Sequence, residues 1–299
     1  MNKRYLPLSL LAVSALALTG CTPAETETVG DGNDDQKSMT ISVFNGWDEA
    51  IAASELWKAI LDEKGYSVEL EYADPAPAFV GLADGDYDVN FDIWLPTTHA
   101  TYLDTYGDEI VDLGAWNEEG RNTIAVNEDA PIDSIAELAE NADLFGNRIV
   151  GIEAGAGLTE MVTNEVIPTY GLEDMDYSIS STAAMLSELT AATESGENIA
   201  VTLWEPHWAN AEFGMKNLED PEGALGGAEG IHTYGKASFV EDFPPGRRVV
   251  RQLRDGPRHA LLPRAGHVRR VRRPGLRPHR RAVDRRQPGV RRLAHELVH

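Results

Sequence analysis

The chain has 299 residues, is 42% hydrophobic and contains one cysteine, so it is long enough for one large domain or two medium ones. A single cysteine excludes a disulfide framework, a cysteine-based zinc site and an iron–sulfur cluster. The formal net charge of −23 argues against a protein that binds nucleic acid.

The charge is distributed unevenly. Residues 1–245 contain 9 Lys and Arg against 46 Asp and Glu, which is a net charge of −37. Residues 246–299 contain 17 Arg, no Lys and three acidic residues, which is a net charge of +14. The acidic body and the basic tail therefore need separate explanations.

The N-terminus has the pattern of a secretory signal. Lys3 and Arg4 precede an apolar stretch, Pro7–Leu18, that is too short to span a bilayer. The stretch leads to Leu18-Thr19-Gly20-Cys21, which resembles the bacterial lipoprotein signal, where the cysteine is acylated and becomes the new N-terminus. The interpretation is a signal peptide over 1–21 with Cys21 as lipid anchor; the alternative is a signal peptide whose cysteine is incidental.

Polar, acidic residues follow the signal. Residues 22–37 lack large apolar side chains and predict a flexible tether. No later segment has roughly 18 consecutive apolar residues, so the mature protein is expected to be extracytoplasmic and held to the membrane by lipid alone.

Strand and helix patterns alternate along the first part of the body. The helix starting at Ala50 is expected to bury one face made of Ile51, Leu56, Ile60 and Leu61. Strands are predicted at 39–44, 67–72 and 89–94, and helices at 50–64 and 77–84. This β-α-β-α-β order is typical of an open α/β sheet.

A second α/β set follows. Its predicted strands are 149–152 and 199–203, and its predicted helices are 158–170 and 182–194. Two such sets predict an α/β protein of two lobes with a ligand cleft between them, lobe 1 being 38–126 with 230–245 returning to it and lobe 2 being 127–229. In open α/β sheets, ligands bind beyond the carboxyl ends of the strands.

Three tryptophans lie at the ends of predicted strands. Trp47 and Trp204 come just after the predicted strands that end at 44 and 203, and Trp94 ends the predicted strand 89–94, so all three can meet at one cleft. Several indole faces around one point suit a cation that cannot donate hydrogen bonds, such as a quaternary ammonium ion. The alternative is that these are core tryptophans.

A small-residue turn and a histidine are candidates for binding an anion. Glu153-Ala154-Gly155-Ala156-Gly157-Leu158 opens a predicted helix, whose free N–H groups attract negative charge. His99, five residues after Trp94, can donate to the carboxylate of a zwitterion. The alternatives are an ordinary turn and a structural histidine.

No enzyme motif is present, neither Gly-x-Ser-x-Gly, nor His-Glu-x-x-His, nor a cysteine nucleophile. The chain is therefore expected not to be an enzyme and to need no cofactor. A metal-capture lipoprotein is a remote alternative, although its candidate ligands have no metal-site spacing. These candidates are His99, Glu205, His207 and His232.

Several motifs together resemble the substrate-binding lipoproteins of ABC importers for glycine betaine and related osmoprotectants, which have the type 2 periplasmic-binding-protein fold. The resemblance covers about Thr40 to Pro244. The motifs are Gly46-Trp47-Asp48, Trp94-Leu95-Pro96-Thr97-Thr98-His99, Gly155-Ala156-Gly157-Leu158, Trp204-Glu205-Pro206-His207-Trp208, Leu218-Glu219-Asp220-Pro221 and Ile231-His232-Thr233.

The resemblance implies a fold that closes on its ligand. It implies a trimethylammonium cage made of Trp47, Trp94 and Trp204, and a carboxylate held by His99 and the N–H groups of Gly157 and Leu158. It implies as partners a small zwitterionic or cationic ligand, the permease and ATPase subunits, and the membrane through the lipid anchor. Choline, carnitine or another betaine is the alternative ligand, and no nucleic acid is expected.

The basic tail does not resemble the end of this family. A natural basic arm usually mixes Lys with Arg, whereas residues 246–299 contain 17 Arg and no Lys. The hypothesis is a reading-frame slip near Phe243–Gly246 in a GC-rich gene, which makes 246–299 an aberrant tail. A genuine Arg-rich arm is the alternative.

Overall fold

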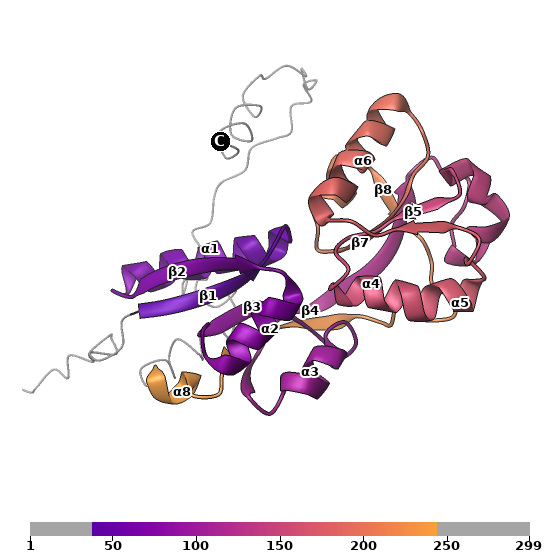
Figure 1. The fold of residues 1–299 in the computed structure, drawn as a ribbon. Coiled ribbons are helices and arrows are strands. Elements are labelled where there is room, and N and C mark those ends of the chain that lie inside the picture. Colours follow the sequence, from indigo (N-terminus) through magenta and orange to yellow (C-terminus); the bar gives the residue numbers. More distant parts are fainter. Residues whose placement is uncertain (1–37, 244–299) are drawn as a thin grey trace, which may run out of the picture. The chain divides into compact units, whose positions relative to one another are not determined.

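The computed structural model of the chain describes residues 38–243 (Figure 1). The predicted signal and anchor (1–21), tether (22–37) and aberrant tail (246–299) lie outside them. Residue contacts separate a unit Met1–Ala260 from a unit Leu261–His299, and all described residues belong to the first. None of the described helices combines the length and apolar character needed to cross a bilayer.

The first sheet begins as the sequence predicted. β1 (Ser38–Phe44) pairs in parallel with β2 (Ser67–Ala73) and β3 (Val89–Leu95), and the connections are α1 (Asp48–Glu63) and α2 (Pro75–Asp84). β1 and β3 are almost wholly buried because both faces of these central strands are covered. The predicted β-α-β-α-β order is confirmed.

The expected buried face of α1 was wrong in part. Leu56 is 43% exposed, and the buried positions are Glu49, Ala50, Ser54, Trp57 and Leu61. Ala50, Ser54, Trp57 and Leu61 are spaced by four, three and four residues, which is one stripe of an α-helix. The stripe is turned away from Leu56 because Trp57 packs on Phe91 of β3, with ring centroids 5.8 Å apart. This orientation also carries Glu49 inward.

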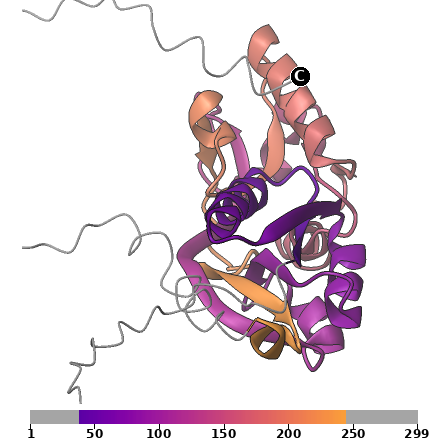
Figure 2. The ribbon, with the colours of Figure 1, turned by 90° about the vertical axis from the view of Figure 1, so that its left-hand side faces the viewer.

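A long strand links two sheets. β4 (Ile110–Asn127) pairs with β9 (Glu229–Lys236) over residues 110–120 and with β7 (Ala200–Glu205) over residues 121–126. β9 lies antiparallel between β3 and β4 in the first sheet, and Figure 2 shows it in orange beside the magenta β4. No strand was predicted over 110–127, because glycine and acidic residues interrupt the apolar pattern there.

The second sheet contains β7, β5 (Arg148–Val150), β6 (Asp176–Ser178) and β8 (Met215–Asn217). The helix predicted over 158–170 is continuous, but it consists of α4 (Gly157–Met161), a π-helical turn over Val162–Val166, and α5 (Ile167–Tyr170). α6 (Thr182–Ser195) starts after Ser181, whose hydroxyl accepts a hydrogen bond from the Ala184 N–H. The remaining short helices are α3 (Ala100–Tyr106), η1 (Ile135–Glu137), η2 (Ala139–Phe145), α7 (Ala209–Glu212) and α8 (Phe239–Asp242).

The three tryptophans stand at the ends of these strands. Trp47 follows β1, Trp94 is the next-to-last residue of β3, and Trp204 is the next-to-last residue of β7. Prolines in cis peptide bonds follow at Leu95-Pro96 and Glu205-Pro206. Two of the tryptophans thus lie at strand ends of the first sheet and one at a strand end of the second, where open α/β sheets place ligands.

Candidate functional site

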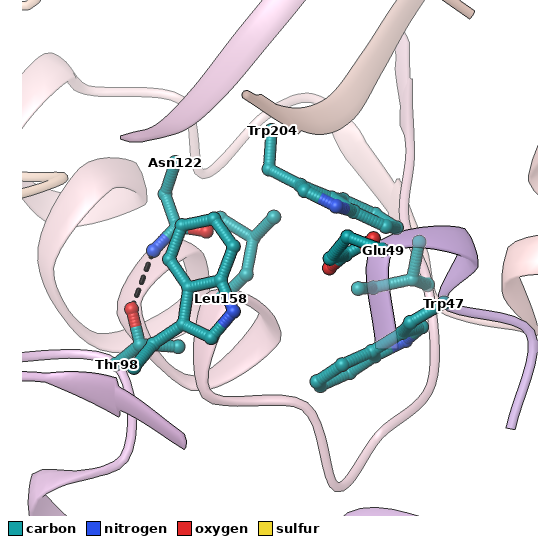
Figure 3. A pocket seen from close by; sticks show the side chains of 8 residues that line it. Trp47, Glu49, Thr98, Asn122, Leu158 and Trp204 are labelled. Carbon is teal, nitrogen blue, oxygen red and sulfur yellow. Dashed lines mark hydrogen bonds between the residues drawn. The ribbon is translucent and has the colours of Figure 1, made fainter. Parts of the chain in front are cut away.

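One pocket brings the three tryptophans together (Figure 3). It contains about 270 Å³ not filled by atoms, part of it open to solvent. It is lined by Trp47, Glu49, Trp94, Thr98, Asn122, Ile152, Leu158 and Trp204. We call it the tryptophan cage.

The indoles of the cage are buried and held in place. Trp47, Trp94 and Trp204 are 5%, 3% and 3% exposed, and the rings of Trp47 and Trp204 lie 6.1 Å apart at 56°. Trp47 Nε1 donates to Glu153 Oε2 over 3.3 Å, and Trp94 Nε1 donates to Asp92 Oδ1 over 2.9 Å. Because these two N–H groups are bonded to their surroundings, the ring faces of Trp47 and Trp94 are oriented before any ligand arrives.

Glu153 links the cage to α6. Its carboxylate accepts hydrogen bonds from the backbone N–H of Thr182 (2.8 Å) and from the Thr182 hydroxyl (3.0 Å), as well as from Trp47. An acidic side chain at a helix N-terminus is stabilised by the helix dipole. Glu153 therefore orients Trp47 of the first sheet from an element of the second.

A polar wall of the cage was not predicted from the sequence. Asn122 Nδ2 donates to Thr98 Oγ1 over 2.6 Å, and the Thr98 hydroxyl donates to Glu229 Oε1. Glu229 Oε2 also accepts from the backbone N–H groups of Thr97 and Thr98, at 2.8 and 3.0 Å. Glu229 is 1% exposed, and these bonds compensate its burial. Its partners are more than 100 residues away in sequence, so no local motif could have indicated it.

Two buried acids at the cage were not predicted either. Glu49 lines the cage and is 9% exposed, and Asp92 lies behind Trp94 and is 1% exposed. Burial raises the pKa of Glu49 to about 8, against an opposing effect of the Trp204 indole N–H. Burial, and then the charge of Glu49, raises the pKa of Asp92 well above its ordinary value. The spacing Trp47-x-Glu49 at a helix start was visible in the sequence, but the inward face of the helix was not.

His99 lies under the cage and does not line it. It is fully buried, with its ring stacked 6.1 Å from Trp47 and within 5.5 Å of Phe44 and Phe79. Its Nδ1 accepts from the Trp94 N–H over 2.8 Å, so any proton of the neutral ring sits on Nε2. Burial lowers the pKa of His99 to about 3. The ring is therefore neutral at physiological pH.

The burial of neutral His99 predicts that the folded protein becomes less stable as the pH falls. The unfolded chain protonates His99 near its ordinary pKa of 6.5, and the folded chain only near 3. Stability due to neutral His99 is thus complete above pH 6.5 and decreases as the pH falls toward 3, by up to about 1.4 kcal/mol per pH unit. We expect thermal unfolding temperatures of His99→Gln to decrease less steeply over this window than those of the parent.

The difference between the unfolding temperatures of the two proteins isolates the contribution of His99 to stability. Glu49 has a raised pKa, so its contribution has the opposite sign and decreases as the pH rises through about 8. Both proteins retain Glu49, and its effect cancels in the difference. Parallel curves for the two proteins would contradict the prediction.

Of the two residues predicted to bind the carboxylate through their N–H groups, Leu158 lines the tryptophan cage and Gly157 does not. Leu158 lines the cage and is 3% exposed. Gly157 packs against the loop that follows β3. A Cβ at position 157 would lie only 1.8 Å from the carbonyl oxygen of Thr98 in that loop. The first helical hydrogen bond of α4 runs from the Glu160 N–H to the Ala156 carbonyl, so the N–H groups of Gly157 and Leu158 precede the helical ladder.

The structure does not support the alternative that the protein captures a metal ion. Across residues 38–243 there is no group of three or more His, Cys, Asp or Glu side chains that could hold a metal ion. His99 is enclosed by aromatic rings, and His232 Nδ1 instead lies 3.0 Å from Asp112 Oδ2. The structure therefore does not bring the candidate ligands together.

Curated sequences contain partial relatives. The chain is 39% identical over 123 residues to the glycine betaine/carnitine transport binding protein GbuC of Listeria monocytogenes, an alignment that covers 40% of either chain. It is 34% identical over 115 residues to the uncharacterized protein ORF1 of Chromohalobacter salexigens, covering 37% of this chain and 74% of that one. The chain thus matches well under two thirds of GbuC.

Solved structures of binding proteins share the fold. A glycine betaine/L-proline-binding protein (ProX) of Borrelia burgdorferi matches with a TM-score of 0.65 at 34% identity, over 69% of this chain and 77% of that one. Lactococcal OpuAC, in a closed conformation with glycine betaine, matches with a TM-score of 0.67 at 28% identity, over 73% and 84%. The predicted fold class, a two-lobed α/β binding protein with a ligand cleft, is confirmed.

A family model covers most of the chain. It describes the substrate-binding domain of the ABC-type glycine betaine transport system, and it matches residues 37–260, about three quarters of the sequence. The proteins with this domain are binding components of transporters and not enzymes, as the lack of catalytic motifs predicted. The chain belongs to the family of substrate-binding domains of ABC-type glycine betaine transport systems.

Proposed function

We propose that this protein is the extracytoplasmic solute-binding component of an ABC importer, and that it captures glycine betaine or a related quaternary-ammonium osmoprotectant. The observation that carries the proposal is the tryptophan cage, with three buried indoles from both sheets around one small pocket. A quaternary ammonium ion has no N–H to donate, so the electron-rich ring faces are its natural partners.

The other end of the ligand is assigned to the start of α4. In the proposal, the N–H groups of Gly157 and Leu158 and the Nε2 of His99 hold the carboxylate. Two features support this: Leu158 lines the cage, and His99 Nε2 has no hydrogen-bond partner among residues 38–243. A helix N-terminus attracts negative charge through its free N–H groups and its dipole.

The ligand is one of several chemically close molecules. Lactococcal OpuAC was crystallised in complex with glycine betaine, and the name of GbuC adds carnitine. Choline is the alternative without a carboxylate, so its binding should not depend on His99. We rank glycine betaine first because the cage and the carboxylate site together match a zwitterion.

The membrane anchor and the partners follow from the same role. We propose that Cys21 carries the lipid, that residues 22–37 tether the binding domain, and that 38–126 with 230–245 and 127–229 form its two lobes. The bound ligand is delivered to a permease that an ATPase subunit drives. The strong negative charge of residues 1–245 would suit a high-salt habitat.

Titration of the intact protein tests the function. We expect intrinsic tryptophan fluorescence to change in a saturable way with glycine betaine, because three of the six tryptophans line the cage. Glycine, which has the carboxylate without the methyl groups, is the control and should cause no change. A folded protein that responds to neither glycine betaine, carnitine nor choline would reject the proposal.

A further inference from the structure

Among the described residues, Glu49 is the one acidic side chain that lines the tryptophan cage. In Figure 3 its carboxyl group is seen between the rings of Trp47 and Trp204. The side chain is more than nine-tenths buried, and its Oε2 has no hydrogen-bond partner within the described part of the chain. The Trp204 indole N–H lies close enough to lower the pKa of Glu49, but it makes no hydrogen bond in the described part of the chain. An unpaired buried polar group is costly, which calls for a reason to keep it.

A second acid lies directly behind the cage. Asp92 Oδ1 accepts from Trp94 Nε1, whereas its Oδ2 has no partner among residues 38–243. A charge on Glu49 raises the pKa of Asp92, so the two carboxyl groups interact. When two carboxyl groups interact in a poorly solvated place, ionisation of one disfavours ionisation of the other.

Within residues 38–243, no basic side chain balances these acids at the cage. Neither the cage nor the adjoining hollow, which Glu49 also lines, includes a Lys or Arg among its described lining residues. Burial lowers the pKa of His207 in that hollow, so its ring is neutral at pH 7. The other ionisable groups nearby are Asp48 on α1, Glu205 at the end of β7, Glu229 bonded to Thr98, and Glu153 and His99 beside Trp47.

We propose that Glu49 is a charged wall of the cage, and that a quaternary ammonium ion entering the cage displaces a proton from the Glu49–Asp92 carboxyl pair into the solvent. The proton moves from a carboxyl oxygen to water or buffer, and the ligand cation takes its place as the neutralising charge. The inference rests on the proposed function and adds to it a linkage between binding and pH.

The linkage has a defined direction. In the free protein burial holds the pKa of Glu49 at about 8, and a cation nearby lowers this pKa by favouring the carboxylate. At pH 7 the free protein therefore carries the proton and the complex has lost it. Affinity should rise as the pH rises toward about 8, by at most about tenfold per pH unit, and then level off.

Calorimetry measures the displaced proton directly. Glycine betaine and choline are titrated into the intact protein at pH 7 in phosphate and in Tris, two buffers with different heats of ionisation. We expect a difference in binding heat that corresponds to up to one proton released per ligand. At about pH 9.5 the release should disappear, since Glu49 is then already ionised.

Variants and a neutral analogue provide the controls. Glu49→Gln mimics the protonated acid, so it should fold and bind without buffer-dependent heat. Asp92→Asn mimics a protonated Asp92 and leaves Glu49 buried, so it should still release the proton. Glu55→Gln, on the exposed face of α1, should behave like the parent. 3,3-Dimethyl-1-butanol, the uncharged analogue of choline, should release no proton if it binds.

The outcomes separate the two proposals. Binding of glycine betaine or choline with equal heats in both buffers, unchanged in Glu49→Gln, overturns the proton linkage and leaves the proposed function intact. Failure of the folded parent to bind any quaternary ammonium ion rejects the proposed function, and the linkage with it. Proton release that persists in Glu49→Gln would assign it to a group other than Glu49 and also overturn the inference.

Discussion

Replacing Trp204 by leucine should weaken glycine betaine binding by about 30-fold or more. A desolvated cation–π contact contributes about 2 kcal/mol or more, and leucine keeps an apolar side chain while it removes the π face. Trp204 is 3% exposed, and its ring lies 6.1 Å from that of Trp47 across the tryptophan cage. The dissociation constant from calorimetry or fluorescence titration measures the effect.

Trp57→Leu is the matched control. Trp57 is 5% exposed and stacks on Phe91, away from the cage. Both variants lose a similar amount of buried aromatic surface, so their thermal stability should fall comparably. Only Trp204→Leu should lose affinity. Equal affinity of the two variants would contradict the assignment of Trp204 to the ligand cation.

Replacing Gly157 by alanine should weaken binding by about 10- to 100-fold while it leaves the stability of the ligand-free protein nearly unchanged. The new Cβ would lie 1.8 Å from the Thr98 carbonyl oxygen and 2.9 Å from Thr98 Cγ2. Overpacking of this kind costs about 1–3 kcal/mol. Thr98 belongs to the loop after β3 and Gly157 begins α4, so separation of these two segments removes the clash without unfolding either.

Gly155→Ala provides the control for this experiment. It lies two residues earlier in the same turn, and a Cβ there would come only within 3.6 Å of the Tyr102 hydroxyl, which is ordinary contact. It should bind glycine betaine like the parent. If Gly157→Ala instead lowered the unfolding temperature strongly and kept its affinity, Gly157 would be a purely structural residue. Thermal unfolding with and without glycine betaine distinguishes the two results.

Local sequence patterns were enough to predict much of the secondary structure and four of the eight residues that line the tryptophan cage. Apolar alternation, helical spacing and turn residues predicted the strands and helices from β1 to β3, and also β5, β7 and the helices between them, because each depends on near neighbours in sequence. Trp47, Trp94 and Trp204 were found because they stand at strand ends, where an open α/β sheet collects its ligand residues. The strand β4 was missed because its pattern is interrupted and its pairing with β9 joins segments far apart in the sequence.

The remaining parts of the site depend on contacts between distant segments. Glu229 reaches Thr97 and Thr98 across more than 100 residues, and Asn122 meets Thr98 only because β4 passes from one sheet to the other. His99 was a ligand candidate by sequence position, and the structure places its ring among Phe44, Trp47 and Phe79. Its protonation state follows from that burial and could not be read from spacing.

By itself the sequence determined which residue types stand at which strand ends, and hence the class of ligand that we propose. Only the tertiary structure decided that the inward face of α1 carries Glu49 into the cage, with Asp92 behind Trp94. The physical reason is desolvation: a carboxyl group has an ordinary pKa in any sequence, and its charge changes only when packing removes water from around it.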